Sequence, residues 1–223
     1  MRPWHGCGPG STPGRSTLFK MNSSKAIKQL RFLEKLVSNH KLRLAAEWKE
    51  KWKILISTIL SPQTKDETTI KISGILYKKY SSPEKLANTS LKEIKRIIKP
   101  INYYKTKAKH IKETAKIISK HRIPKTREEL MKLPGVGRKV ANVYLAEAYN
   151  AQTIGVDTHV SRISQKLGWT KNKNPYKIEK DLEILFPKNY WNSINYIVVR
   201  FGRIYGKSRK NEDKILKRIK SLN

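Results

Sequence analysis

Helical periodicity is the feature that most limits what this chain can fold into. From Met21 onward, apolar residues recur at three- and four-residue spacing, as Ile27, Leu30 and Leu33 do, and this spacing gives an α-helix one apolar face. No segment alternates polar and apolar residues for long, and the only strand-like stretch is 153–156. The sequence therefore predicts an all-α fold.

Start and stop signals place the boundaries of these helices. Residues 90–93 and 126–129 are capping boxes, in which a serine or threonine side chain accepts from the third backbone N–H of the helix. Asp66 and Asp157 are suited to the same N-cap position, and Gly168 can end a helix. These signals predict helices over 25–40, 47–59, 67–80, 105–121, 138–149, 158–167, 175–186 and 191–205, with further helices opening at Ser82, Ser90, Thr126 and Asn211.

The charge of the chain indicates a polyanionic partner. Its 223 residues carry 49 Lys and Arg against 17 Asp and Glu, a formal net charge of +32. A folded chain tolerates such self-repulsion more readily when it works bound to a polyanion, so nucleic acid is the favoured partner and an anionic membrane the second. The basic residues spread over many predicted helices, and no apolar run approaches the ~20 residues of a membrane span.

Cysteine content and the N-terminal residues restrict the chain further. The single cysteine, Cys7, excludes an internal disulfide framework, a cysteine-based zinc site and a cysteine-ligated iron–sulfur cluster. Residues 1–20 show no helical pattern and hold many of the Gly and Pro residues, so we expect a flexible extension or a tag outside the fold. They contain no apolar segment of the kind that a secretory signal needs, and we expect an intracellular protein.

Residues 133–139, Leu-Pro-Gly-Val-Gly-Arg-Lys, form the sharpest local motif. A short helix, a tight turn with two glycines and a second helix are expected here. The glycines permit positive φ angles and leave no side chain over the loop, so backbone N–H groups at the start of the second helix can approach an anion. An ordinary helix–helix turn has the same composition. The basic character of the chain favours a hairpin that binds phosphate.

Lys139 and Asp157 are the candidate chemical groups. Lys139 lies in the first turn of a helix beside Arg138, and both the helix dipole and the neighbouring charge favour a neutral, nucleophilic amine. From position alone, a further phosphate contact is the simpler role. Asp157 is well placed to be an N-cap, and its carboxylate can also stabilise positive charge or manage protons. Sequence spacing does not by itself bring the two residues together.

Residues 133–162 resemble the helix-hairpin-helix–Gly/Pro–Asp signature of the endonuclease III branch of DNA base-excision glycosylases. The match includes the hairpin, the lysine that ends Gly-Arg-Lys and the aspartate of Val-Asp-Thr-His. Upstream, residues 60–66 resemble the Leu-Ser-x-Gln-x-x-Asp segment of the family. Residues 102–108 resemble its Gly-x-x-x-x-Lys-Ala segment, with Asn102 where a glycine is usual. Asparagine tolerates a left-handed backbone, so this replacement is mild.

The resemblance implies two helical domains flanking a DNA-binding cleft. A helical barrel that contains the helix-hairpin-helix motif is expected over 44–151, and a second domain over 21–43 plus 152–223. Enzymes of this kind flip a damaged nucleotide out of duplex DNA into the cleft and cut its glycosidic bond. Lys139 is then expected on one wall of the cleft and Asp157 on the other.

The same resemblance implies roles for individual residues. Lys139 would attack the sugar C1′, expel the base and form a Schiff base that undergoes β-elimination, and Asp157 would support departure of the base. Gln63 matches the residue that fills the gap left by the flipped nucleotide. The hairpin would hold a DNA phosphate, and family hairpins often hold an alkali cation as well; its residues are Gly135, Val136, Gly137 and Arg138.

These roles imply a bifunctional DNA glycosylase and AP lyase acting on duplex DNA with a damaged base or an abasic site. Oxidised pyrimidines, the usual targets of this branch, are the expected substrates. The alternatives are a glycosylase for 8-oxoguanine or mismatched bases and a non-catalytic helix-hairpin-helix DNA-binding protein. The lysine at position 139 favours the bifunctional enzyme, since relatives that only remove mismatched bases usually have another residue there.

The resemblance also leads to expectations about the cofactors of the protein and its location in the cell. Many family members hold an iron–sulfur cluster through four C-terminal cysteines, whereas Gly206 occupies the first of these positions here. We therefore expect no cluster and no protein-held metal, and the spread of the basic residues and the lack of a long apolar run lead us to expect no membrane partner. We also expect a monomer that resides with DNA, in the cytoplasm or nucleoid of a prokaryote or in the nucleus or mitochondrion of a eukaryote.

Overall fold

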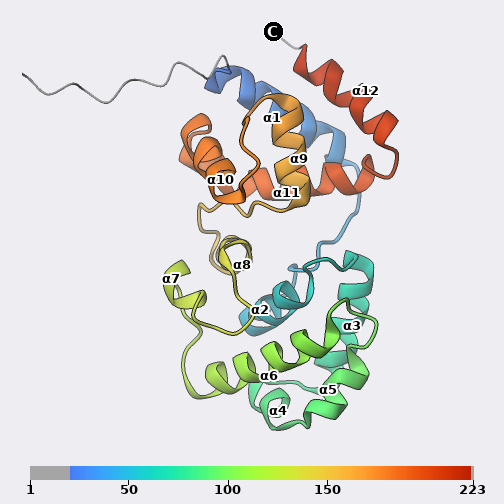
Figure 1. Ribbon diagram of the computed structural model, residues 1–223, viewed down its shortest axis with the longest axis vertical. Helices are drawn as coiled ribbons and strands as arrows, with labels where there is room; N and C mark the ends of the chain where they lie inside the picture. The colour runs from blue at the N-terminus through green and yellow to red at the C-terminus, as the bar shows by residue number, and fades with distance from the viewer. Residues whose placement is uncertain (1–20, 222–223) are drawn as a thin grey trace, which may run out of the picture.

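A computed structural model describes residues 21–221, and within this range the fold is all-helical, without strands (Figure 1). The predicted N-terminal extension, 1–20, lies outside the described residues. No helix in 21–221 has the length and apolar character needed to cross a membrane. The helices are α1 (Ser23–Ser38), α2 (Lys51–Leu60), α3 (Asp66–Lys79), α4 (Pro83–Asn88), α5 (Leu91–Ile97), α6 (Tyr104–Lys120), α7 (Arg127–Leu130), α8 (Arg138–Tyr149), α9 (Thr158–Leu167), α10 (Pro175–Leu185), the 3-10 helix η1 (Lys188–Tyr190), α11 (Trp191–Ile204) and α12 (Arg209–Lys220).

Several boundaries follow from the capping side chains that the sequence predicts. Ser90 Oγ accepts from the backbone N–H of Glu93 at 3.2 Å at the start of α5, and Thr126 caps α7 in the same way. Asp157 Oδ1 accepts from the N–H of Val160 at 2.8 Å and so begins α9. The helix ends at Gly168, whose φ of +81° is available to glycine at little cost.

The predicted N-cap role of Asp66 is wrong. Lys65 occupies the cap position, and Asp66 is the first residue of α3. Its side chain is buried and forms an ion pair with Arg203 of α11, with 2.6 Å between Asp66 Oδ2 and Arg203 Nη1. A partner so distant in the sequence leaves no local signal, so the pattern of residues around Asp66 indicated only the helix start.

The helices are arranged in two halves (Figure 1), and each half has its own hydrophobic cluster. One contains buried residues from Ala46 to Leu145, contributed by α2 to α8. The other joins α1 to α9, α10, α11 and α12, with Trp169 and Phe201 fully buried in it. Leu44, the first residue of the predicted barrel, packs in this second cluster. The chain crosses between the halves near residues 44–46 and 145–154, and the candidate site lies where these crossings meet.

A buried carboxylate attaches the last helix to the second half. The side chain of Glu212 on α12 is fully buried and accepts hydrogen bonds from Arg162 and Lys166 of α9, at 2.8 Å each. Burial acts to raise the pKa of the Glu212 carboxyl, but the hydrogen bonds from these two cations outweigh it and lower the pKa to about 2. Glu212 therefore stays ionised at neutral pH and holds α12 against α9.

Replacing this carboxylate is expected to cost stability in a pH-dependent way. Glu212→Gln should lower the free energy of unfolding at pH 7 by about 3 kcal/mol, because it leaves Arg162 without its carboxylate partner and Lys166 with Asp213 alone. A carboxyl whose pKa falls from 4.5 to about 2 on folding stabilises the protein above pH 4.5 and loses that contribution as the pH falls to 2. Denaturant unfolding of the two proteins should therefore converge at low pH.

The matched control is Glu128→Gln, which removes a largely exposed carboxylate that pairs with Arg127. An exposed ion pair contributes little, so the stability of this variant should not differ measurably from that of wild type. A Glu212→Gln protein as stable as the control at pH 7 would contradict the role assigned to Glu212.

Candidate active site

The hairpin between α7 and α8 has the predicted shape, but its two glycines serve different purposes. Gly135 has φ of +79°, and a Cβ at this position would lie 2.8 Å from Nδ1 of His110 on α6. Gly137 has φ of −87°, which any residue can adopt, and a Cβ there would meet open space. Only Gly135 therefore uses positive φ, while Gly137 leaves the start of α8 uncovered.

The start of α8 has free backbone donors. Gly137 occupies the N-cap position and offers no side chain to the first turn, whose N–H groups have no acceptor within the helix. The N–H of Val136 is already bound to the carbonyl of Leu133 at 3.1 Å, and the Val136 side chain is buried in the core. The donors available to an anion are thus those of the first turn of α8, which also carry the positive end of the helix dipole.

Arg138 is committed to a partner on α10. Its Nε and Nη2 donate to the two carboxylate oxygens of the buried Glu179 at 2.8 Å each, and its guanidinium lies 4.7 Å from the ring of Tyr176. This two-pronged pair joins α8 of the hairpin to α10 of the second half. A DNA contact by Arg138 remains a prediction, and it would use a guanidinium already bound to Glu179.

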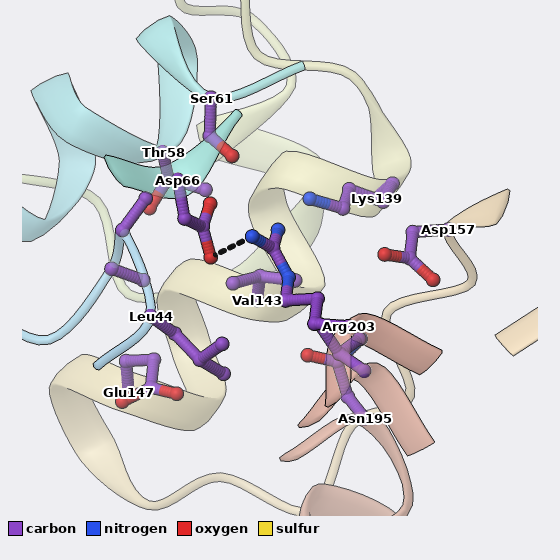
Figure 2. Close-up of a pocket in the computed structure, with 13 residues that line it drawn as sticks. Leu44, Thr58, Ser61, Asp66, Lys139, Val143, Glu147, Asp157, Asn195 and Arg203 are labelled. Atoms are coloured by element: carbon purple, nitrogen blue, oxygen red, sulfur yellow. Dashed lines mark ion pairs between the residues drawn. The ribbon is translucent and has the colours of Figure 1, made fainter. Parts of the chain in front are cut away.

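The structure brings Lys139 and Asp157 together. Both line an open hollow of about 880 Å³, which we call the outer hollow, and both also line a small inner cavity of about 40 Å³ behind it. Figure 2 shows the amine of Lys139 and the carboxylate of Asp157 directed into the same space from different segments. Asp157 Oδ1 also caps α9, which confirms the structural role predicted for this residue, and its chemical role stays a prediction.

The Lys139 amine has a lowered pKa, in the predicted direction but for a different reason. Burial is the main cause, and the positive charge of Arg203 adds to it, while the carboxylates of Asp157 and Asp66 act in the opposite direction. Arg138, the neighbour expected to depress the pKa, is neutralised by Glu179. The neutral form of the Lys139 amine is therefore more populated than it would be for an exposed lysine.

Asp66 and Arg203 are site residues that sequence reasoning did not single out. They line the inner cavity, and their ion pair spans it from α3 to α11, as the dashed line in Figure 2 shows. Burial raises the pKa of the Asp66 carboxyl, and Arg203 opposes this shift. Asp66 closes the segment that resembles the family pattern at 60–66, which was a usable signal, whereas nothing local distinguished Arg203.

Gln63 lies at the edge of the outer hollow, in the turn between α2 and α3. Its φ is +58°, in the left-handed region. The side-chain Nδ2 of Asn102 donates to the carbonyl of Gln63, and the N–H of Asn102 donates to Thr64 Oγ1 at 3.2 Å. The left-handed residue of the second segment is not Asn102 but its neighbour Tyr103, with φ of +59° and a side chain 66% exposed. Sequence reasoning missed this exposed aromatic residue.

Comparison with known proteins agrees with this geometry. The profile of the HhH-GPD superfamily of base excision DNA repair proteins matches residues 56–188. Endonuclease III of Thermotoga maritima is 42% identical over 155 residues, covering 68% of this chain and 73% of that protein. Endonuclease III of Synechocystis sp. is 36% identical over 201 residues, covering 87% of this chain and 91% of that protein.

A solved structure agrees as well. The structure of a trapped endonuclease III–DNA covalent intermediate is similar with a TM-score of 0.78 at 30% identity, over 85% of this chain and 90% of that one. The hairpin, Lys139 and Asp157 all lie within residues 56–188 that match the family profile. The chain belongs to the HhH-GPD superfamily of base excision DNA repair proteins.

Proposed function

We propose that this protein is a DNA glycosylase and AP lyase of the endonuclease III type. The observation that carries the proposal is the shared outer hollow, which holds a half-buried lysine with a lowered pKa and an aspartate. Phosphate binding alone would need neither a desolvated amine nor a facing carboxylate. Covalent catalysis at a sugar carbon needs both, because the amine must be neutral to attack and the departing base leaves positive charge behind.

The chemistry follows from these two groups. The neutral amine of Lys139 forms a bond to C1′ as the glycosidic bond breaks. The electron pair of the glycosidic bond leaves with the base, and the base takes up a proton. Loss of the amine proton and opening of the sugar ring give a Schiff base between Nζ and C1′. This iminium withdraws electrons, so a proton is lost from C2′ and the 3′-phosphate departs by β-elimination. Asp157 stabilises the developing cation and accepts protons.

The sizes of the two spaces suggest where a nucleotide sits. The outer hollow of about 880 Å³ is within the range of ligand sites. The inner cavity of about 40 Å³ admits little more than water. We therefore place the flipped nucleotide in the outer hollow, with its C1′ toward Lys139, and leave the inner cavity to the Asp66–Arg203 pair.

DNA binding is assigned to the surfaces around this hollow. The first turn of α8 offers its N–H groups to a phosphate, and the net charge of +32 supplies long-range attraction. Gln63 is placed to fill the gap that a flipped nucleotide leaves. Tyr103 follows Asn102, which binds the Gln63 carbonyl, and its exposed ring is suited to stacking on a base. A repair role places the protein inside the cell, with the DNA.

The hairpin assignment makes a prediction at Gly137. A serine there should cap α8, so Gly137→Ser should keep or slightly raise the free energy of unfolding. The same hydroxyl would occupy an N–H group offered to phosphate, and affinity for duplex DNA should fall about tenfold. Gly135→Ala should instead lose about 1–2 kcal/mol of stability, because Gly135 has positive φ and its Cβ would contact His110. Fluorescence anisotropy and denaturant unfolding separate the two outcomes, and unchanged affinity for Gly137→Ser would contradict the hairpin role.

An iron–sulfur cluster is not part of the proposal. The residues that follow α11 offer no cysteine, since the only cysteine of the chain is Cys7. A Cβ added at Gly206 would lie 2.2 Å from the carbonyl oxygen of Gly202 and 2.7 Å from Glu212 Oε2, so the backbone there has no room for a cysteine side chain. The residues present do not fit the cluster, and we propose that the enzyme works without one.

Oxidised pyrimidines are the proposed substrates, as the similarity to endonuclease III favours. The test is a panel of duplexes, each with one defined lesion, assayed for base release and for strand cleavage at an abasic site. We expect release of an oxidised pyrimidine and cleavage of abasic DNA by the same protein. Binding to every duplex with steep salt dependence but no cleavage would support a non-catalytic module, and release of 8-oxoguanine alone would change the substrate class.

A further inference from the structure

A buried lysine outside the catalytic pair holds the segment that carries Gln63. Lys107 on α6 is 7% exposed, and its ammonium donates to the carbonyls of Leu60 and Pro62 at 2.7 and 2.6 Å and to Thr64 Oγ1 at 3.3 Å. All three acceptors are neutral oxygens of residues 60–64, the end of α2 and the turn that follows it. Burial lowers the pKa of Lys107 to about 8. A buried cation with only neutral partners is unfavourable for folding, so its hydrogen bonds to the turn must offset this cost.

The contacts of Lys107 converge on one short stretch of backbone. Leu60 ends α2, so the ammonium satisfies a carbonyl at the negative end of that helix. Asn102, just before α6, binds the same stretch from its other side, through Gln63 and Thr64. Residues 60–64 are therefore tied to the start of α6 by a buried cation and by an exposed amide.

Gln63, at the centre of this stretch, has a backbone that needs such support. Its φ of +58° lies in a region that residues other than glycine seldom occupy. Such a conformation persists when its surroundings fix it, and it is commonly found where function requires it. Here the fixed backbone leaves the Gln63 side chain exposed at the edge of the outer hollow.

We propose that Lys107 is a positioning residue for DNA engagement, whose ammonium fixes residues 60–64 so that Gln63 is ready to enter the base stack when a nucleotide leaves it. The proposal rests on the proposed function, because it assumes a flipped nucleotide. Lys107 touches neither the sugar nor the base in this account. It acts by sparing the turn the cost of becoming ordered when DNA binds.

Lys107→Met tests the proposal, because methionine is of similar length and has no donor. The substrates are a duplex with one abasic site, in which the gap must be filled, and the same strand alone, which has no stack to fill. Single-turnover cleavage is measured over a range of protein concentrations. We expect the concentration for half-maximal rate to rise about tenfold or more on the duplex. On the single strand the rate and its concentration dependence should stay within about twofold of wild type.

The matched control is Lys109→Met, which removes an exposed lysine from the same helix. Loss of one exposed positive charge should weaken the binding of duplex and of single strand modestly and to the same extent. Equal losses by Lys107→Met on duplex and single strand would reduce Lys107 to a structural or electrostatic role and overturn the proposal. An unchanged duplex reaction would overturn it as well.

Two further variants keep the test independent of overall stability. Asn102→Ala removes the exposed half of the tie without emptying a buried site, and should show the same duplex-specific loss if Lys107→Met does not fold. In the double variant Lys107→Met/Gln63→Ala, the duplex loss should not exceed that of the worse single variant, since Lys107 acts through Gln63. Multiplying losses would contradict this. Cleavage of the abasic duplex by the wild type tests the proposed function alone. If the wild type does not cleave, the proposed function is wrong, whereas the role of Lys107 is tested by how its variants differ from a wild type that cleaves.

Discussion

Lys139→Gln is expected to abolish covalent chemistry while leaving DNA binding intact. Borohydride reduction of a reaction with abasic duplex should trap the wild-type protein on DNA, and trapping by the variant should fall by about 10³-fold or more, as for other removed nucleophiles. Glutamine is neutral and of similar length, so it replaces a desolvated amine without stranding a charge. The free energy of unfolding and the affinity for abasic duplex should therefore stay close to wild type.

The control for this variant is Lys132→Gln, which removes an exposed lysine on the other side of the hairpin. It removes one exposed positive charge close in sequence to Lys139, so it measures the electrostatic share of any loss. Trapping by Lys132→Gln should remain within about threefold of wild type. Undiminished trapping by Lys139→Gln would remove Lys139 from the role of nucleophile.

Asp157→Asn is expected to separate the two roles of this residue. Asparagine is as good an N-cap as aspartate, so α9 should keep its start and the protein its stability. Base release should nevertheless fall by about 10²- to 10⁴-fold, the range typical of a lost acid–base group. Asp157→Ala should show the same catalytic loss and also lose about 1 kcal/mol of stability with the cap. Base release and denaturant unfolding are measured on both variants.

The direction of the Lys139 pKa sharpens this test. The carboxylate of Asp157 raises the pKa of the Lys139 amine, so Asp157→Asn should lower that pKa further and increase the neutral fraction of the amine. A shortage of neutral amine cannot then explain a slow variant. Base release by Asp157→Asn at the wild-type rate would mean that Asp157 serves only as a cap.

Local features of the fold were predictable because their causes are local. The capping side chains of Ser90, Thr126 and Asp157 act on N–H groups three residues away, and α8 begins and ends at the predicted residues. The turn at Gly135 and the lowered pKa of the Lys139 amine were also predicted from a run of seven residues. What a residue does through its sequence neighbours can be read from the chain alone.

Features made by distant partners could not be predicted. Arg203 and Asp66 are separated by most of the chain, and only folding shows that their pair spans the inner cavity. Arg138 was expected to lower the pKa of Lys139, but its guanidinium forms an ion pair with Glu179 on α10. Lys107 belongs to the segment 102–108 that resembles the family pattern, but its hydrogen bonds to residues 60–64 follow from the packing of α6 against the turn.

The most direct measurement of the central claim is to identify which lysine carries the sugar after borohydride reduction. Wild-type protein trapped on abasic duplex is digested with nuclease and protease, and the modified peptide is located by mass spectrometry. The account predicts a reduced deoxyribose remnant on Lys139 and on no other residue. Lys107 is the sharpest competitor, because burial lowers its pKa to about 8, but Lys107 does not line the outer hollow and its nitrogen is bound to the carbonyls of Leu60 and Pro62. A remnant on Lys107 or on any amine other than Lys139 would contradict the account.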